Sequence, residues 1–405
     1  MTHRIIATVL IASVCLFASP ILAQSTEAGQ ESSLSKPVLA ALREVQKLQA
    51  EGDTEKAVAR IAEIEAFPSL SIDDIYFTAA VKLNLAMATR NSRLIEDALV
   101  KMLSTGKVSA ADQPNFLKRL SSLALQRQDF KAATKFFEQL LALSPNDAEV
   151  MISLGDLYLR EKHNSKALAM TNRAIVAYEA AGAVAPEAWY RRVLSIAYDS
   201  RTPDAIQPAA LALVAAYPNP VNWRDSLRAL RVRYPESVEP AELDLWRLRA
   251  ATGSLNTERD FVDFAETTLR LGFPSDAETA LKQGIAKGIL NTSKPLISEI
   301  IATASNQASV QKASLPRLER EATSNRQLAL NIGDIYFGYG EFSRAASMYR
   351  MAIGEVGIDP SVANLRLGAA LARAGDKAGA RAAFTRVNGG FSEALARYWM
   401  VFVGR

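Results

Sequence analysis

The sequence predicts an all-α protein built as an α-solenoid, a continuous stack of antiparallel helix pairs. Residues 114–179 align with themselves at an offset of 34 residues, which places Leu120 over Leu154. Near the C terminus a similar pattern recurs after 35 residues, from Gly333 to Gly368. Two helices of about three to four turns, with their tight turns, occupy roughly this length, so each period corresponds to one layer. No alternating apolar pattern of useful length predicts a strand.

The period is clearest in four segments, which are residues 114–147, 148–181, 326–360 and 361–394. Each carries small residues where the two helices of a pair are expected to cross, so that the backbones approach to about 8–10 Å. Among these small residues are Gly155, Ala167, Gly333, Ala345, Gly368 and Ala380. Aromatic residues such as Tyr349 and Phe384 are expected to fill the remaining space. Pro145 and Pro360 are expected in the connections, because a helix must stop there.

The remaining segments fit the same period less well. Residues 48–64 and 264–284 each match one degenerate unit. Residues 182–325 are interpreted as irregular layers of the same solenoid, with a softer boundary at residues 293–325, which are more polar than their flanks. The prolines expected to lengthen or bend connections are Pro203, Pro208, Pro218, Pro220, Pro235 and Pro240.

The N terminus carries a separate signal. Arg4, an apolar run and the small residues that end at Ala23 are typical of a secretory signal peptide over residues 1–23. Residues 24–36 are then expected to be a flexible lead-in, and residues 37–405 the solenoid. Cleavage after Ala23 would place the mature protein in the periplasm. The alternative is an uncleaved membrane anchor, or a lipid on Cys15, although no small residue directly precedes this cysteine.

The residue inventory disfavours an enzyme. Removal of the leader takes away the only cysteine and leaves His163 as the single histidine, expected in a turn between two helices. The sequence therefore offers no cysteine nucleophile, no zinc-binding cluster and no phosphate-binding loop, and we expect no catalytic residue, no metal and no cofactor.

Three polar pairs have spacings that occur in catalytic sites. Ser33 with Lys36 and Ser309 with Lys312 match the spacing of serine-lysine acylases, and Asp73 with Asp74 is a pair of adjacent carboxylates. Neither serine-lysine pair has the further motifs that such a site needs. Adjacent acidic residues are common at helix starts, where they complement the helix dipole, and we interpret the aspartate pair in this way.

The charge balance does not predict a nucleic-acid partner. The chain has 47 basic and 43 acidic residues, a formal net charge of +4. Nucleic-acid binding requires basic groups concentrated on one face. Here the arginines of residues 224–249 alternate with acidic residues, which favours a salt-bridged helix pair, although contact with an anionic glycan stays open.

The repeat positions resemble those of the tetratricopeptide repeat family. The pattern is an apolar and a small residue on the first helix followed by an aromatic residue, such as Leu154, Gly155 and Tyr158, and then alanine, an aromatic residue and alanine on the second. The resemblance is good in the four clearest repeats, roughly a third of the chain. It implies a superhelix whose concave groove is lined by the first helix of each pair.

Carried over position by position, the resemblance implies a groove that holds a protein or peptide partner. The groove residues are expected to be Asn115, Lys118, Ser122, Gln126, Asp156, Arg160, Asp334, Phe337 and Arg373. Family members that clamp a terminal carboxylate have asparagines at positions occupied here by Ser122 and Asp156, which disfavours that activity.

The function expected from this resemblance is a non-catalytic scaffold for protein-protein interaction in the bacterial cell envelope. The alternative is an auxiliary protein that associates with glycan or peptidoglycan. The sequence predicts no contact with nucleic acid, and a membrane contact only if the leader is kept or lipidated. It does not predict an oligomeric state.

Overall fold

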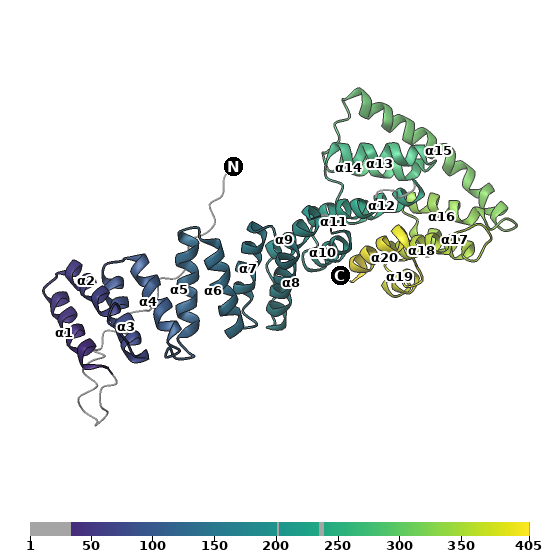
Figure 1. Ribbon diagram of the computed structural model, residues 1–405. Helices are drawn as coiled ribbons and strands as arrows, with labels where there is room; N and C mark the ends of the chain where they lie inside the picture. The colour runs from purple at the N-terminus through teal and green to yellow at the C-terminus, as the bar shows by residue number, and fades with distance from the viewer. Residues whose placement is uncertain (1–33, 201, 235–238, 405) are drawn as a thin grey trace. The chain divides into compact units, whose positions relative to one another are not determined.

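A computed structural model describes residues 34–200, 202–234 and 239–404 of the chain. Within these ranges it contains twenty α-helices and no strand (Figure 1). The expected signal peptide and residues 24–33 of the lead-in lie outside the described residues. None of the described helices combines the length and the apolar character needed to cross a membrane.

The helices form two compact units. Unit 1 ends at Asn146, and unit 2 begins at Asp147. The helices of unit 1 are α1 (Lys36–Ala50), α2 (Thr54–Glu65), α3 (Ile72–Ala88), α4 (Ser92–Ser104), α5 (Gln113–Gln126) and α6 (Phe130–Leu143). They pack as three consecutive pairs, α1 with α2, α3 with α4, and α5 with α6.

Unit 2 contains the other fourteen described helices. They are α7 (Ala148–Arg160), α8 (Asn164–Ala180), α9 (Glu187–Asp199), α10 (Pro203–Ala216), α11 (Pro220–Arg233), α12 (Glu239–Ala251), α13 (Glu258–Arg270), α14 (Pro274–Ala286), α15 (Pro295–Ala322), α16 (Leu328–Gly338), α17 (Phe342–Ala352), α18 (Pro360–Ala374), α19 (Lys377–Phe384) and α20 (Gly390–Val403). Pairs of the same kind are α7 with α8, α9 with α10, α13 with α14, α16 with α17, and α18 with α19.

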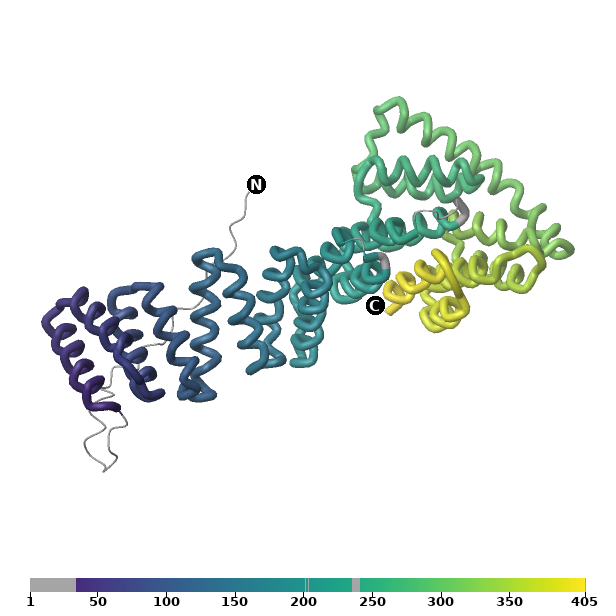
Figure 2. Tube along the Cα trace, in the orientation of Figure 1, coloured from purple at the N-terminus to yellow at the C-terminus, as the bar shows by residue number. Residues whose placement is uncertain are grey.

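The chain of unit 2 turns back on itself. Helix α20 packs against α10 and α12, and α18 packs against α12, although these helices are far apart in the sequence (Figure 2). The Trp223 ring of α11 lies 6.2 Å from the Tyr398 ring of α20, and both side chains are completely buried. The C-terminal repeats are therefore closed around α12 and do not continue outward as an open stack.

Most of the turns inside the helix pairs share a common backbone conformation. One residue adopts the left-handed conformation directly before the N-cap of the second helix, as Gly52 does before α2 and Gln128 before α6. The next residue is commonly an aspartate whose side chain accepts a backbone hydrogen bond, for example Asp53 from Lys56 and Asp129 from Ala132. Because the N-cap satisfies an otherwise unpaired helix donor, this two-residue signal starts the second helix of a pair.

The structure confirms the role of the small residues in close helix crossings. A Cβ atom added to Gly333 would lie 2.6 Å from Cε1 of Tyr349, and one added to Gly368 would lie 2.4 Å from Cε1 of Phe384. Both aromatic rings are completely buried in the opposing helix. Glycine at these positions thus lets an aromatic side chain lie against the backbone of the first helix.

A Gly368→Ala substitution is expected to destabilise unit 2 by about 1–3 kcal/mol, because the buried ring of Phe384 must move away from the new methyl group. This cost exceeds the gain of about 1 kcal/mol in helix propensity that alanine brings over glycine. Gly155→Ala is the matched comparison, since its Cβ would lie 2.9 Å from Oγ1 of Thr171, a small side chain. Thermal unfolding followed by circular dichroism should rank Gly368→Ala well below Gly155→Ala, and equal effects would contradict the packing argument.

Several connections differ from the sequence-based expectation. Four of the six prolines expected to alter connections lie in helices: Pro203 and Pro220 begin α10 and α11, and Pro208 and Pro240 lie within α10 and α12. Proline is well tolerated in a first turn, where its missing N–H has no intrahelical partner, which accounts for Pro203, Pro220 and Pro240 but not for Pro208 inside α10.

Three expected boundaries also change. Pro360 begins α18, where a connection was expected, and the softer boundary at residues 293–325 is spanned by the 28-residue helix α15. Helix α1 begins at Lys36, within the expected lead-in. Ser35 before it donates its N–H and hydroxyl to Asp74.

Candidate functional site

The predicted groove residues of unit 1 form an exposed polar stripe on one helix. Asn115, Lys118, Ser122 and Gln126 all lie on α5 at intervals of three or four residues, and all four are exposed. The opposite side of α5, which includes Leu120, is buried against neighbouring helices. The structure thus places these four residues on a solvent-facing surface, as a binding surface requires.

The predicted groove residues Asp156 and Arg160 lie on α7, the first helix of unit 2. Arg160 is exposed, and Asp156 forms an ion pair with Arg192 of α9. This ion pair therefore joins α7 and α9, which are the first helices of two successive pairs.

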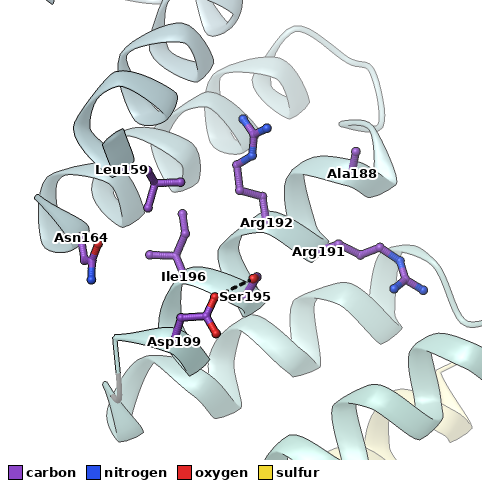
Figure 3. A pocket seen from close by; sticks show the side chains of 8 residues that line it. All are labelled: Leu159, Asn164, Ala188, Arg191, Arg192, Ser195, Ile196 and Asp199. Carbon is purple, nitrogen blue, oxygen red and sulfur yellow. Dashed lines mark hydrogen bonds between the residues drawn. The ribbon is translucent and has the colours of Figure 1, made fainter. Parts of the chain in front are cut away.

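A pocket of about 380 Å³ lies beside this ion pair. Leu159, Ala188 and Ile196 supply apolar side chains, and Figure 3 shows Arg192 and Asp199 on opposite sides of Ile196. We call this the α7–α9 pocket, lined by Leu159, Asn164, Ala188, Arg191, Arg192, Ser195, Ile196 and Asp199. The α9 residues of this pocket were not predicted, because α9 belongs to the irregular segment, residues 182–325, where repeat positions could not be assigned.

The charged residues of the α7–α9 pocket differ in whether the protein itself supplies a partner of opposite charge. Arg191 is held by Glu187, by Asn222 and by Asp225, so it is part of the packing between α9 and α11. Asp199 accepts a hydrogen bond of 3.1 Å from the Ser195 hydroxyl, and no described cation lies within ion-pair distance of it. The pocket therefore presents an exposed carboxylate next to an apolar surface.

The predicted groove residues Asp334 and Phe337 are not available to a partner, and this part of the prediction was wrong. Asp334 is 0% exposed and Phe337 is 8% exposed, because helix α14 and the side chain of Arg247 from α12 cover the side of α16 that was expected to face solvent. Arg373 of α18 is exposed, and its guanidinium lies 4.8 Å from the centre of the Phe342 ring.

Asp334 instead belongs to a network of buried charges centred on Arg247 of α12. The Nε and Nη2 atoms of Arg247 donate to the two carboxylate oxygens of Asp276 at 2.9 and 2.8 Å. Its Nη1 donates to Oδ1 of Asp334 at 2.7 Å, and Tyr349 donates its hydroxyl to the same oxygen at 2.8 Å. The guanidinium also lies 4.4 Å from the centre of the Phe337 ring.

Arg366 of α18 completes the network. Its Nη1 donates to the second carboxylate oxygen of Asp334 at 2.7 Å, and its Nε donates to both oxygens of Asp244 at 3.1 and 3.3 Å. We call the six residues the buried charge cluster: Asp244, Arg247, Asp276, Asp334, Tyr349 and Arg366. Each is less than a tenth exposed, and the cluster joins α12 to α14, α16, α17 and α18.

The buried charge cluster contains three carboxylates and two guanidinium groups. Burial raises the pKa of Asp244 and of Asp276 from the ordinary value of 3.8, although the neighbouring arginines act in the opposite direction. A carboxyl whose pKa is higher in the folded state takes up a proton on folding. The resulting stability is present below pH 3.8 and is lost as the pH rises through the raised folded-state pKa.

Asp244 and Asp276 are therefore expected to contribute more to the free energy of unfolding of unit 2 as the pH is lowered from neutral towards 3.8. Urea denaturation at each pH measures this change, and Asp244→Asn should reduce it. Asp260→Asn is the control. Burial raises the pKa of Asp260, but hydrogen bonds from Arg249 and Thr257 lower it by more, so this carboxylate stays ionised at these pH values. An unchanged pH dependence in Asp244→Asn would contradict the assignment.

The polar pairs that were weighed as catalytic have structural partners. Asp74 accepts hydrogen bonds from Ser71 and Ser35 at the start of α3, and Asp73 forms an ion pair with Lys107. Lys312 lies over the Tyr339 ring, and Ser33 lies outside the described residues.

His163 occupies the turn before α8, as expected, beside Glu161. Among the described residues, no group of histidine, cysteine, aspartate and glutamate side chains is arranged to hold a metal ion.

Comparison with known proteins agrees with this architecture. Residues 124–185 match the model of the tetratricopeptide repeat family. No protein of curated function matches the sequence.

Solved structures with similar helix arrangements include the C-terminal part of a TPR repeat-containing protein from Cytophaga hutchinsonii, with 9% identity and a TM-score of 0.30 over 79% of this chain and 97% of the other. A tetratricopeptide repeat protein from Parabacteroides merdae has 15% identity and a TM-score of 0.25 over 67% of this chain and 100% of the other. These TM-scores are too low to support a fold assignment. The fold is defined by the helix pairs of this chain and agrees with the match to the family model.

Proposed function

We propose that this tetratricopeptide repeat chain is a non-catalytic scaffold that binds a peptide or helix of a protein partner in the α7–α9 pocket. Repeats of this family generally mediate protein-protein interaction. The observation that supports the site is a pocket that combines an apolar floor with an exposed carboxylate, on helices within and next to the segment that matches the family model.

The chemistry of the pocket suggests what the partner offers. Leu159 and Ile196 form an apolar contact surface, on which a partner's leucine, valine or aromatic side chain would lose its contact with water. Asp199 would attract a lysine or arginine of the partner, because it has no described cation nearby. Arg192, which lies on the other side of Ile196 (Figure 3) and pairs with Asp156, would bind an acidic group of the partner. The expected partner segment is therefore apolar at its centre, with opposite charges at its two ends.

The proposed location of this interaction is the bacterial periplasm, and the proposed role is assembly of an envelope complex. The location is proposed from the signal-like composition of residues 1–23, and the role by analogy with other scaffolds built from such repeats. Fractionation of cells that express the full chain tests the location. A mature protein that begins at Gln24 in the periplasmic fraction would support it, and an unprocessed protein in the cytoplasm would contradict it.

Site-specific crosslinking tests the binding site. A photoreactive residue in place of the exposed Ser195 is expected to capture a protein neighbour in intact cells, which mass spectrometry then identifies. Adding Asp199→Lys should reduce the capture at least tenfold, since it reverses the charge that attracts the partner. The control is Glu299→Lys on α15, which reverses another exposed carboxylate of unit 2.

Both charge variants should retain the thermal stability of the parent protein, because exposed charges contribute little to folding. Equal capture by the parent, Asp199→Lys and Glu299→Lys proteins would contradict the proposed site. Recovery of saccharide with no protein neighbour would favour the glycan-associated alternative instead.

A further inference from the structure

Helix α12 is enclosed by the other helices of unit 2. Residues 243–248 are six consecutive buried residues, so the helix has no solvent-facing side along this stretch. It lies between α13 on one side and α18 and α20 on the other (Figure 1). A helix that is buried all round is normally apolar, yet this one carries Asp244 and Arg247 at its centre.

The surroundings of Asp244 and Arg247 are built from three helices, α14, α16 and α18, and α14 presents Asp276 to Arg247. Helices α16 and α18 each begin a pair, and they present Asp334 and Arg366 to α12. Arg247 fits between two carboxylates and the face of the Phe337 ring, an arrangement that combines charge-assisted hydrogen bonds with a cation–π contact. Asp244 receives the matching guanidinium of Arg366. Helices α16 and α18 thus contact a cation and an anion of α12 that are three residues apart.

Apolar contacts between α12 and its neighbours add to these charged contacts along the helix. The Trp246 ring stacks on Phe264 of α13, with ring centres 5.6 Å apart and planes 7° apart. Leu243 and Leu248 are completely buried. A buried aromatic residue and a paired arginine at the centre, with apolar residues on either side, is the composition of a binding hot spot between separate proteins.

We propose that α12 is a resident ligand, which occupies the groove of the C-terminal repeats in the way that a partner helix would. The class of partner that fits this second groove is a helix with aspartate and arginine three residues apart, with a tryptophan between them and a leucine on either side. Because α12 is part of the same chain, its effective concentration at the groove is high, on the order of millimolar or above. The groove therefore stays closed to weakly binding helices in the intact protein.

Addition of the helix as a separate peptide tests this proposal. A fluorescent peptide of residues 239–251 is added to the full chain carrying Arg247→Met, in which the resident helix has lost its central contact. The peptide is expected to bind this variant at least tenfold more tightly than it binds the unmodified chain, and to raise the melting temperature of the variant. The same peptide carrying Arg247→Met is the matched control and should do neither.

Circular dichroism first establishes that the Arg247→Met chain is folded. If it is not, the full chain with Asp244→Asn replaces it, and the unmodified peptide is compared with one carrying Asp244→Asn. Tighter binding of the unmodified peptide supports the proposal. Failure of the unmodified peptide to bind a folded variant, or equal binding of the two peptides, overturns it.

Discussion

Replacement of Arg247 by methionine is expected to lower the free energy of unfolding of unit 2 by about 3–5 kcal/mol. Methionine keeps much of the side-chain length but removes the guanidinium that pairs with Asp276 and one of the two that pair with Asp334, which keeps only Arg366. Both carboxylates are almost completely buried, at 5% and 0% exposure, so water cannot replace the lost hydrogen bonds. The cost is the penalty of unpaired buried charge and not the net contribution of the ion pairs.

Tryptophan fluorescence during urea denaturation measures this loss in unit 2 alone, because all four tryptophans of the chain lie in that unit. They are Trp189, Trp223, Trp246 and Trp399. The control is Arg259→Met, which removes an arginine that is 88% exposed and pairs with Asp263 at 3.4 Å. An exposed pair of this kind contributes about 0.5 kcal/mol or less. A similar loss in both variants would contradict the account of the buried charge cluster.

Replacement of Trp399 by alanine is expected to destabilise unit 2 by about 3–5 kcal/mol. The indole is 0% exposed, with its ring centre 6.2 Å from Phe384 and 5.4 Å from Phe402. Its removal would leave a cavity between α19 and α20 that the surrounding helices can fill only in part. The effect should be large because α20 also holds α10 and α12 in place.

Thermal unfolding followed by circular dichroism measures the effect of Trp399→Ala. Met400→Ala on the same helix is the control, since Met400 is only partly buried and should cost clearly less. If the two substitutions shifted the melting temperature equally, α20 would not be the closing element that its packing indicates.

The repeated helix pairs could be predicted from the sequence because their cause is local and periodic. Glycine at 333 and 368, with an aromatic ring opposite, is a short-range constraint that recurs at a fixed interval, and the structure confirms it. The closure of unit 2 could not be predicted in this way, because it depends on contacts such as Trp223 with Tyr398, between residues with no fixed spacing.

The same contrast between local, periodic causes and long-range contacts applies to the residues of the candidate site. The exposed positions on α5 and α7 followed from the period, whereas Asp334 was expected in solvent and is buried under α14 and the side chain of Arg247. One signal in the sequence pointed to this outcome. Asp334 is the only charged residue of α16, whereas Arg247 is one of five charged residues of α12. A single charge within an apolar helix is seldom buried without a partner of opposite charge, so such residues indicate a buried ion pair.

The enclosure of α12 by the C-terminal repeats is tested most directly by hydrogen exchange of the full chain, followed by mass spectrometry. Backbone amides of residues 243–248 are expected to be among the slowest to exchange in unit 2, since opening them requires the surrounding helices to separate. Amides of the more exposed α15 should exchange much faster. Exchange of α12 at the rate of α15 would contradict the closed arrangement and, with it, the proposal that α12 occupies the groove of the C-terminal repeats.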